Sequence, residues 1–370
     1  MFKFSLLKND SETSARLGQI STAHGLIDTP VFMPVGTRAT VRTMTPEELK
    51  EVRAEIILSN AYHLYLRPGA EIVEKAGGLH KFMHWDRPIL TDSGGFQIFS
   101  LSSIMRVEAD GVEFRSPLDG SKHFFTPELA IDVQEKLGAD IIMPLDHCVS
   151  YPSDRETVAK AVDLTTAWAR RCQEAHTRDD QALFGIVQGG VYPELRKKSA
   201  EELSALDFPG YALGGLSVGE PIDLANDMIS HTTQSLPVEK PRYLMGVGSV
   251  AEIGVAISHG IDMFDSVFPT RVARNGTAFT SAGRVNIRNK KYEDDFQPID
   301  ANCNCYCCAN YSRSYIRHLY MAGEILPLRL LTQHNLTFTI NAVLSARDAI
   351  SQGTFQGWLD NILALEGNKS

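Results

Sequence analysis

Three aspartates stand at the carboxyl ends of apolar runs, where their side chains could act together. Asp92 ends "PILTD", Asp146 ends "ADIIMPLD", and Asp265 lies in "IDMFDSV". One aspartate at a strand end is most often an N-cap or turn residue, but three converging carboxylates repel one another unless a ligand or proton compensates. Because two carboxylates beside a sugar can cleave a glycosidic bond, Asp265 is a candidate nucleophile and Asp92 a candidate proton carrier.

Glycine pairs beside these runs favour a pocket for a flat ligand. In "TDSGGFQ" the glycines allow close backbone approach, and Phe96 offers a ring to stack on. A guanine base would present its N1–H and N2–H donors to Asp146 and its O6 acceptor to Gln188. Met245 could pack on the opposite ring face, although Phe96 and Met245 are more often plain core residues on sequence grounds alone. Two further glycine pairs occur at Gly189-Gly190 and Gly214-Gly215.

Four of the six cysteines fall in "CNCYCC", which begins at Cys303. Since disulfides rarely persist in a cytoplasmic protein, this cluster favours metal or thiol chemistry. Cys303, Cys305 and Cys308 with His334 would make a closed tetrahedral set for a structural Zn²⁺. Cys307 is surplus and competes with Cys308 for the last thiolate position. A redox cluster and unliganded thiols are the alternatives.

The charge of the chain is unevenly distributed. Its formal net charge is −9, which argues against wholesale nucleic-acid binding. Residues 271–292, however, include six basic residues and no acidic one. A solvated loop is the simpler explanation, and a chain of phosphates is the other natural partner.

Eight apolar runs alternate with helical patterns, which favours an α/β fold with a parallel sheet buried on both faces. Eight such units predict a (β/α)8 TIM barrel, whose active site would lie at the carboxyl ends of the strands. Helices are expected to begin with N-caps at Thr45, Thr126, Ser153 and Ser249. The predicted strands are 31–36, 55–61, 88–94, 139–146, 182–189, 210–215, 243–248 and 261–267.

The remaining segments complete the expected organisation. An N-terminal addition is expected over 1–30, and an insertion after the third strand over 102–125. An amphipathic helix is expected over 312–327, with His334 lying just before a helix that begins at Asn335. No run approaches the roughly 20 apolar residues of a membrane span, and the start of the chain contains no translocation signal, so we expect a cytoplasmic protein.

Several motifs together closely resemble the bacterial tRNA-guanine transglycosylases, also called queuine tRNA-ribosyltransferases. The resemblance extends over roughly residues 5 to 365. Its motifs, in chain order, are "TDSGGFQ", "MPLDHCVSYP", "GIVQGG", "GGLSVGE", "YLMGVG", "GIDMFDSVFPTRVARNG", and the cysteine cluster with "TQHN".

The resemblance implies a pentosyltransferase that exchanges guanine at the anticodon wobble position of tRNAs with a GUN anticodon for 7-aminomethyl-7-deazaguanine (preQ1). It implies that Asp265 forms a covalent link to ribose and that Asp92 is the general acid/base. The base would be bound by Asp92, Ser93, Phe96, Asp146, Gln188, Gly215, Leu216, Glu220 and Met245. The anticodon loop would be held by Thr270, Arg271 and Arg274.

The same resemblance implies how the chain is organised and which base it takes. It suggests a barrel core over 31–270, a tRNA-contacting and zinc-binding subdomain over 271–345, a C-terminal helix completing the barrel over 346–370, and a homodimer. Glu220 would support a backbone flip near Leu216 that adapts the pocket to the incoming amine. Val218 and Cys148 resemble the bacterial form, which favours preQ1 over the bulkier queuine.

Three positions depart from the family pattern. Phe96 stands where many bacterial members have tyrosine, His147 replaces an acid, and Ser217 replaces alanine.

Three rival functions are alternatives to this one. A non-catalytic tRNA-binding subunit would lack the aspartates that this chain has at positions 92 and 265. An archaeal-type enzyme would be expected to carry further C-terminal domains, and a hydrolase with a catalytic zinc would have its ligands on strand ends.

Overall fold

The computed structural model describes residues 2–101 and 105–367. It begins with an antiparallel three-stranded sheet made of β1 (Lys3–Asn9), β2 (Arg16–Thr22) and β3 (Gly25–Thr29), in that order. This sheet corresponds to the expected N-terminal addition, except for Met1, which lies outside the described residues. Arg16 anchors it, because its buried guanidinium bonds to both carboxylate oxygens of Asp262 at 2.9 and 2.6 Å.

Parallel strands form two arcs. The first has the order β11-β10-β6-β5 and the second the order β12-β13-β14-β15-β4. Their bounds are β4 (Val31–Pro34), β5 (Ile57–Asn60), β6 (Ile89–Asp92), β10 (Ile141–Ile142), β11 (Ala182–Leu183), β12 (Gly185–Val187), β13 (Tyr211–Leu213), β14 (Arg242–Leu244) and β15 (Met263–Ser266). The predicted α/β class is confirmed.

The two arcs meet at both of their ends. A parallel bridge joins Val35 to Leu58, and the Gly36 N–H donates to the Leu58 carbonyl at 2.6 Å. At the other junction only Phe184 separates β11 from β12. The Phe184 N–H donates to Ile142 in the first arc at 3.0 Å, and the next N–H donates to Gly210, beside the second arc, at 2.9 Å.

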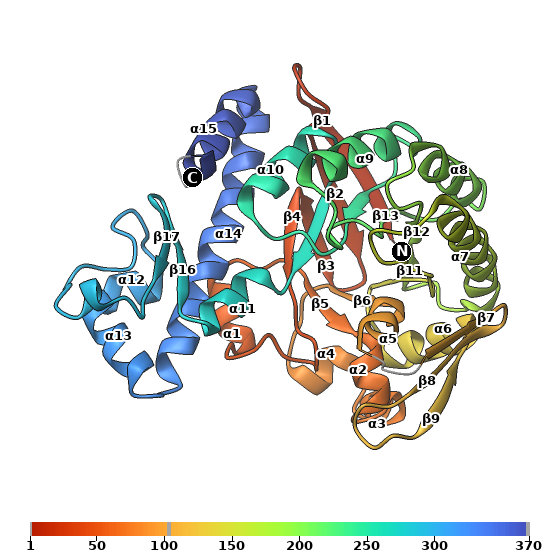
Figure 1. The fold of residues 1–370 in the computed structure, drawn as a ribbon, viewed down its shortest axis with the longest axis horizontal. Coiled ribbons are helices and arrows are strands. Elements are labelled where there is room, and N and C mark those ends of the chain that lie inside the picture. The colour runs from red at the N-terminus through yellow and green to blue at the C-terminus, as the bar shows by residue number, and fades with distance from the viewer. Residues whose placement is uncertain (1, 102–104, 368–370) are drawn as a thin grey trace.

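Helices separate the strands and cover them, as Figure 1 shows. Thr45 caps the first of these helices in a capping box with Glu48, and Thr126 and Ser249 cap two others, so these three predictions are confirmed. The prediction for Ser153 is wrong. Asp154 caps that helix instead, because its carboxylate accepts the Thr157 N–H at 2.9 Å. The helices are α1 (Pro46–Glu51), α2 (Ala61–Leu66), α3 (Ala70–Lys75), α4 (Gly78–Met83), α5 (Gly95–Leu101), α6 (Pro127–Leu137), α7 (Arg155–Ala175), α8 (Pro193–Ser204), α9 (Ile222–Gln234), α10 (Val250–Ser258) and α11 (Phe268–Arg274).

The strands are shorter than the apolar runs predicted. The run 139–146 yields only β10, because the backbone of Met143 bonds to a side chain instead of a neighbouring strand. Gln134, buried on α6, accepts the Met143 N–H at 2.9 Å and donates to its carbonyl at 2.8 Å. Asp146 therefore lies in the loop after the strand, not at its last residue.

The expected insertion over 102–125 is an antiparallel sheet of β7 (Met105–Glu108), β8 (Gly111–Arg115) and β9 (Lys122–Phe125). Residues 102–104 of this prediction lie outside the described residues. Val112, Phe114 and Phe125 are buried in the main core, so the insertion packs firmly on the α/β body.

A C-terminal lobe follows α11, on the left in Figure 1. It contains β16 (Thr277–Thr280), β17 (Gly283–Asn286), the 3-10 helix η1 (Lys290–Tyr292), α12 (Tyr306–Asn310) and α13 (Arg313–Met321). The expectation for 312–327 agrees with α13, which ends earlier. Two longer helices, α14 (Leu326–Gln352) and α15 (Phe355–Gly367), then lead back to the α/β body.

His334 lies inside α14, so the prediction that it precedes a helix is wrong. Pro327 sits in the first turn of α14, and the helix continues without a break until Gly353, which adopts φ 71° at the C-cap. The expected boundary between 345 and 346 also falls inside this helix. Residues 368–370 of the last expected segment lie outside the described residues.

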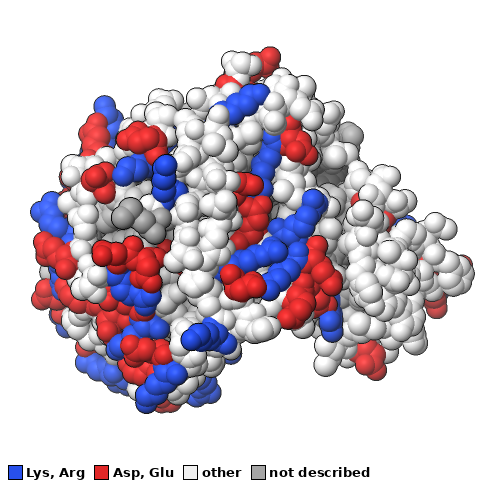
Figure 2. Space-filling view, turned by 180° about the vertical axis from the view of Figure 1, so that it is seen from behind, with Lys and Arg blue, Asp and Glu red and all other residues white. Residues whose placement is uncertain are grey.

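Among the described residues no helix is long and apolar enough to cross a membrane. Seen from behind, the α/β body carries interspersed acidic and basic side chains, and the lobe on the right carries few charges (Figure 2). The lobe instead exposes aromatic side chains, including Phe296 and Tyr306.

Candidate functional site

The carboxyl ends of the parallel strands surround one cavity of about 430 Å³. Its wall comes from segments far apart in the chain, which the two arcs bring to one edge. The predicted site residues that line it are Asp92, Ser93, Phe96, Asp146, Gln188, Gly215, Leu216, Met245, Asp265 and Arg271. Glu220, Thr270 and Arg274 lie outside this lining.

Asp92, the last residue of β6, is held by three donors. Its Oδ1 accepts the Ala61 N–H at 3.0 Å, and its Oδ2 accepts from Gln97 at 2.8 Å and from Asn60. Burial is the main reason why the pKa of Asp92 is raised to about 7, and the nearby charge of Asp265 raises it further against the opposing hydrogen bonds. Near neutral pH this carboxyl group can therefore both give and take a proton.

Asp265 lies on β15 and receives two hydrogen bonds on one oxygen. The Tyr243 hydroxyl donates to Oδ1 at 2.5 Å, and the Gly246 N–H donates to the same atom at 2.9 Å. Burial raises the pKa of Asp265, and these two donors lower it by stabilising the charged form. Both donors hold the carboxylate in one orientation at the cavity wall.

Asp146 and Gln188 form a buried pair on the same wall. The Gln188 amide donates to Asp146 Oδ2 at 2.7 Å, and the Ser93 hydroxyl donates to Oδ1 at 3.3 Å. Burial raises the pKa of Asp146 to about 6. Because Gly95 lacks a side chain, the backbone of α5 approaches closely: a Cβ there would lie 2.8 Å from Asp146 Oδ1. This pair offers acceptor and amide groups to a polar ring edge.

The segment after β13 turns its backbone between Leu216 and Glu220. Both Glu220 carboxylate oxygens accept backbone donors, from the Ser217 N–H at 2.5 Å and from the Val218 N–H at 3.0 Å. In a trans peptide the carbonyl points opposite to the N–H. The Leu216 carbonyl therefore points away from Glu220. Ser217 adopts φ 58°, a left-handed conformation that costs free energy for a residue with a side chain.

Phe96, on α5, and Met245, just after β14, both line the cavity. Phe96 is 51% exposed, so it is not a core residue, and Met245 packs at the edge of the inner apolar cluster. Of the two alternatives left by the sequence, the wall of a cavity fits Phe96 better than core packing does.

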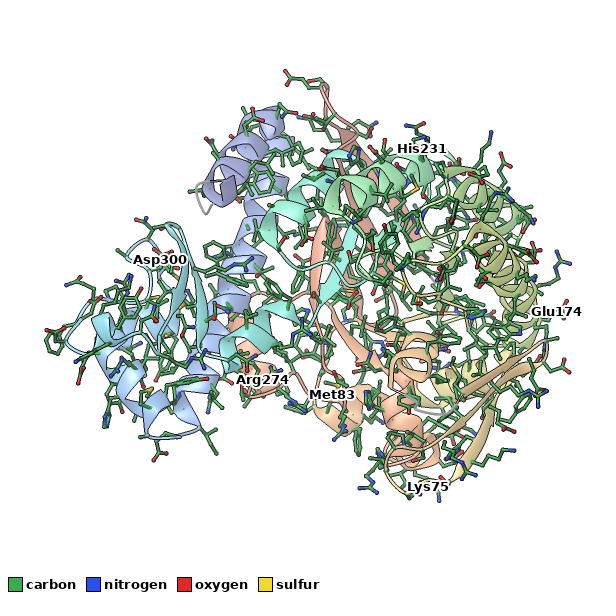
Figure 3. All side chains as sticks on the ribbon, in the orientation of Figure 1. Lys75, Met83, Glu174, His231, Arg274 and Asp300 are labelled. Atoms are coloured by element: carbon green, nitrogen blue, oxygen red, sulfur yellow. The ribbon has the colours of Figure 1, made fainter. Side chains whose placement is uncertain are left out.

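Helix α11 follows Asp265 directly and carries three predicted residues. Thr270 is buried, and its hydroxyl donates to the Val267 carbonyl at 3.1 Å. The charges of Arg42 and Arg271, after the larger effect of burial, lower the pKa of Arg274. Arg274, labelled in Figure 3, thus lies in a group of like charges where α11 meets the lobe.

Sequence reasoning missed the residues that orient the two aspartates, namely Asn60, Gln97 and Tyr243. A signal was available for each. Asn60 ends its strand as Asp92 does, and Gln97 and Tyr243 lie within the motifs "TDSGGFQ" and "YLMGVG". Once Asp92 and Asp265 are identified as candidates, amide and hydroxyl side chains in the same motifs are the expected hydrogen-bond donors to them.

The structure brings Cys303, Cys305, Cys308 and His334 together in a group that could hold a metal ion. His334 Nδ1 lies 3.5 Å from Cys305 Sγ and 3.3 Å from Cys308 Sγ. Its Nε2 donates to the Phe279 carbonyl at 2.6 Å, which leaves Nδ1 to face the sulfur atoms. Three thiols and one imidazole suit a closed tetrahedral site. Cys307 is fully buried in the apolar core of the lobe and is not part of this group.

A second group, His24, His80 and Asp140, has suitable atoms but unsuitable geometry. The two imidazole rings are stacked, with centroids 3.5 Å apart and planes only 14° from parallel. Because an imidazole binds a metal in the plane of its ring, stacked rings cannot both point at one ion. His24 Nδ1 lies 2.9 Å from Asp140, which also accepts the Ile89 N–H at 2.9 Å, so the group ties α4 and the β2–β3 turn to the body.

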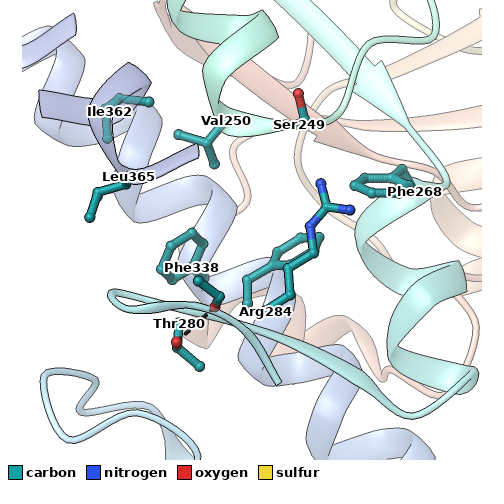
Figure 4. A pocket seen from close by; sticks show the side chains of 10 residues that line it. Ser249, Val250, Phe268, Thr280, Arg284, Phe338, Ile362 and Leu365 are labelled. Carbon is teal, nitrogen blue, oxygen red and sulfur yellow. Dashed lines mark hydrogen bonds between the residues drawn. The ribbon is translucent and has the colours of Figure 1, made fainter. Parts of the chain in front are cut away.

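A separate, mostly apolar hollow lies between the lobe and the C-terminal helices (Figure 4). Arg284 lies over the Phe268 and Phe279 rings, 5.2 and 5.9 Å from their centroids. Ile362 and Leu365 of α15 close the opposite side. This hollow lies behind α11 and contains none of the predicted site residues.

Known proteins that are similar to this chain share one name. The family model described as "Queuine tRNA-ribosyltransferase" matches residues 10–367. A protein of that name from Thermoanaerobacter sp. (strain X514) is 60% identical over 351 residues, covering 95% of this chain and 94% of its own length. Relatives of the same name from Pelotomaculum thermopropionicum and Halothermothrix orenii are 56% and 55% identical, and each covers at least 97% of this chain. This chain therefore belongs to the queuine tRNA-ribosyltransferase family.

Proposed function

We propose that this protein replaces guanine at the wobble position of GUN-anticodon tRNAs with preQ1, through a covalent aspartyl-ribosyl intermediate. The observation that carries the proposal is the pair of buried carboxylates, Asp92 and Asp265, on one cavity wall. They interact electrostatically yet have separate sets of hydrogen-bond donors, as two groups with different roles require.

We infer that the two arcs of parallel strands form one closed barrel of eight strands, in which β11 and β12, separated only by Phe184, count as one strand. The Val35–Leu58 bridge at one junction and the bonds on either side of Phe184 at the other support this closure. In such a barrel all strand ends meet at one rim, which explains why residues at the ends of strands in both arcs share the cavity.

The exchange would take two displacements. Asp265 attacks the ribose C1′ atom as the bond to guanine breaks, and the departing base takes the proton of Asp92. The incoming base then gives a proton to Asp92 and attacks C1′, and Asp265 leaves as a free carboxylate. Two inversions give net retention, and the enzyme returns to its starting protonation state.

The base would lie between Phe96 and Met245 with its polar edge toward Asp146 and Gln188. Asp146 would accept from the ring N–H and amino groups, and Gln188 would donate to the carbonyl oxygen. Ser93 supports Asp146 through its 3.3 Å hydrogen bond. A raised pKa of Asp146 fits a group whose charge is stabilised only when these donors arrive.

The orientation of the Leu216 peptide supports preQ1 as the incoming base. With the Ser217 N–H bonded to Glu220, the Leu216 carbonyl is free to accept a hydrogen bond from the aminomethyl cation. An uncharged guanine has no such donor at that position. Glu220 would act through the backbone and not by touching the base.

The arginines of α11 would hold the anticodon loop. Arg271 lines the cavity that contains Asp265, and Arg274 lies among the like charges of Arg42 and Arg271. Such a group is relieved by phosphate. Thr270 would contribute by shaping α11, since its hydroxyl bonds within the helix.

The four-ligand group in the lobe fits a structural Zn²⁺, which would cross-link α12 to α14. His334 also bonds to β16, and the neighbouring Asn335 accepts the Phe279 N–H at 2.9 Å and donates to the Pro269 carbonyl at 3.0 Å. The metal would therefore fix α11 at its correct distance from the barrel rim. The homodimer expected from the family would use exposed aromatic side chains of the lobe.

Incubation with guanine-labelled tRNA and labelled preQ1 tests the proposal. We expect label from preQ1 in the RNA and an equal amount of free guanine in solution, without net hydrolysis. Queuine in place of preQ1 should be incorporated at least about tenfold less efficiently, because the pocket is built for a small amine. Release of guanine without incorporation would instead identify a hydrolase.

The pH dependence follows from Asp92. Its pKa of about 7 means that the carboxyl carries its proton below that pH and loses it above. Because guanine departure needs this proton, kcat/KM for tRNA should fall about tenfold per pH unit above neutrality. The measurement is the initial exchange rate between pH 5.5 and 9 at constant ionic strength.

Gln97→Ala provides the control for this profile. It removes a donor that stabilises the charged form of Asp92, so the pKa of Asp92 should rise and the alkaline limb should move to higher pH. If the rate of this variant falls at the same alkaline pH as that of the wild type, a group other than Asp92 controls the decrease.

A further inference from the structure

Arg196 is a fully buried cation on α8 that forms no ion pair within the described part of the chain. Its donors go to backbone carbonyls: Nε to Gly190 at 2.7 Å, and Nη2 to Gly214 at 3.0 Å and Gly215 at 3.3 Å. Its Nη1 atom is buried without a hydrogen-bond partner. A buried guanidinium without a hydrogen-bonded carboxylate is costly, and the carboxylate of Glu220 acts on Arg196 only through its charge, against the larger effect of burial on the Arg196 pKa.

The carbonyls that Arg196 binds belong to the loops that border the cavity. Since trans peptides have their carbonyl and N–H groups on opposite sides, pulling the Gly214 carbonyl toward α8 turns the Gly215 N–H the other way. In the same way, the hydrogen bond from Arg196 to the Gly215 carbonyl turns the Leu216 N–H away from α8. Gly215, Leu216 and Cys148 all line the cavity, and the Gly215 N–H, turned away from α8, faces the Cys148 thiol, whose pKa it lowers against the larger effect of burial.

The glycines make this approach possible. Gly189 adopts φ 142°, and a Cβ there would lie 2.6 Å from the Arg196 backbone nitrogen and 2.7 Å from its Cγ. Gly215 adopts φ 65°, and a Cβ there would lie 2.4 Å from the Gln188 amide oxygen. The glycine pairs noted in the sequence therefore admit a buried arginine on one side and Gln188 on the other.

We propose that Arg196 is a positioning residue that aims and polarises the Gly215 and Leu216 N–H groups at the carbonyl oxygen of the bound base. This rests on the proposed function and adds a component to it. A carbonyl that accepts from a cation makes the N–H of the same peptide a stronger donor. Negative charge that develops on the departing guanine would be stabilised by these donors, with the guanidinium behind them.

Base discrimination by the variant Arg196→Met tests the proposal. Binding of guanine and of 2-aminopurine, which lacks the carbonyl oxygen, is measured by calorimetry for the wild type and the variant. We expect guanine affinity to fall roughly a hundredfold and the guanine preference over 2-aminopurine to fall at least about tenfold. The altered contact of 2-aminopurine with Asp146 is common to both proteins and cancels in this comparison.

Arg196→Lys and Arg242→Met complete the design. Lysine keeps the charge but supplies fewer aligned donors, so it should recover part of the preference, and it serves if the methionine variant does not fold. Arg242 is also buried and bonds to the Leu236 and Gly260 carbonyls at 3.2 and 3.5 Å, but it does not line the cavity. Its loss should lower the Tm and leave the base preference unchanged.

The outcomes separate the two proposals. A wild-type protein without a preference for guanine would contradict the proposed base recognition itself. A preference that the Arg196 variants retain, or lose no more than Arg242→Met does, would overturn the role of Arg196 alone. We also expect the Arg196 variants to bind tRNA with the affinity of the wild type. A general loss of structure would instead weaken the binding of tRNA and of guanine together.

Discussion

Asp265→Asn will lower the rate of guanine exchange by at least about a thousandfold and remove the covalent RNA adduct. An amide nitrogen or oxygen is a far weaker nucleophile than a carboxylate, and the double displacement has no second route to the ribosyl intermediate. Quenched single-turnover reactions, resolved on denaturing gels, measure the adduct directly. Binding of tRNA should change by only a few fold, since phosphate contacts supply most of its affinity.

The fold should survive this substitution. An asparagine oxygen can still accept from the Tyr243 hydroxyl and the Gly246 N–H, which both bond to one oxygen of Asp265. Tyr243→Phe is the matched control, because it removes one donor and keeps the nucleophile. It should slow the exchange by about tenfold to a hundredfold while still forming adduct. An adduct trapped in Asp265→Asn would eliminate Asp265 as the attacking group.

The second large effect is expected from Cys308→Ser. Serine is a poor ligand for soft metal ions, so we expect one ion per chain in the purified wild type and little metal in the variant. The free energy of unfolding should fall by several kcal/mol, because binding of a structural metal contributes directly to folding. Elemental analysis and calorimetry measure the two effects independently.

Cys307→Ser is the control for the metal site. Cys307 lies in the apolar core of the lobe and outside the four-ligand group, so its replacement should leave the metal content unchanged. Its Tm should fall slightly, since a buried hydroxyl costs about 1 kcal/mol or more without a partner. The reverse order of metal loss would make Cys307 the ligand.

Much of the site could be predicted because the sequence shows where strands end, and the ends of parallel strands lie together in the fold. Apolar runs ending in polar residues mark the strands, and parallel strands bring their ends to one edge. Asp92, Gln188 and Asp265 needed no further information. The exact extent of each strand did not follow, because tertiary contacts such as those of Gln134 with Met143 replace ladder bonds.

Long-range partners were the other information missing from the sequence. Nothing near Arg196 in the chain indicates that its donors reach Gly214, eighteen positions away. The sequence predicts His334 just before a helix that begins at Asn335, and the residues on either side of it, Gln333 and Asn335, are polar. In the structure they are buried, and Asn335 uses its amide to bond to Pro269 and Phe279, so polarity there reflects specific contacts and not exposure.

Helix α14 has a mechanical consequence for the whole molecule. Near its start it supplies His334 to the group that could hold a metal ion, and near its end the Arg347 guanidinium bonds to the Pro30 carbonyl and, at 2.6 Å, to Glu55. One continuous helix thus joins the C-terminal lobe to the α/β body, so we expect that neither region can unfold without destabilising the other. The lobe and the α/β body should behave as one cooperative unit on heating, so that damage to the group of Cys303, Cys305, Cys308 and His334 would also affect the cavity at the strand ends.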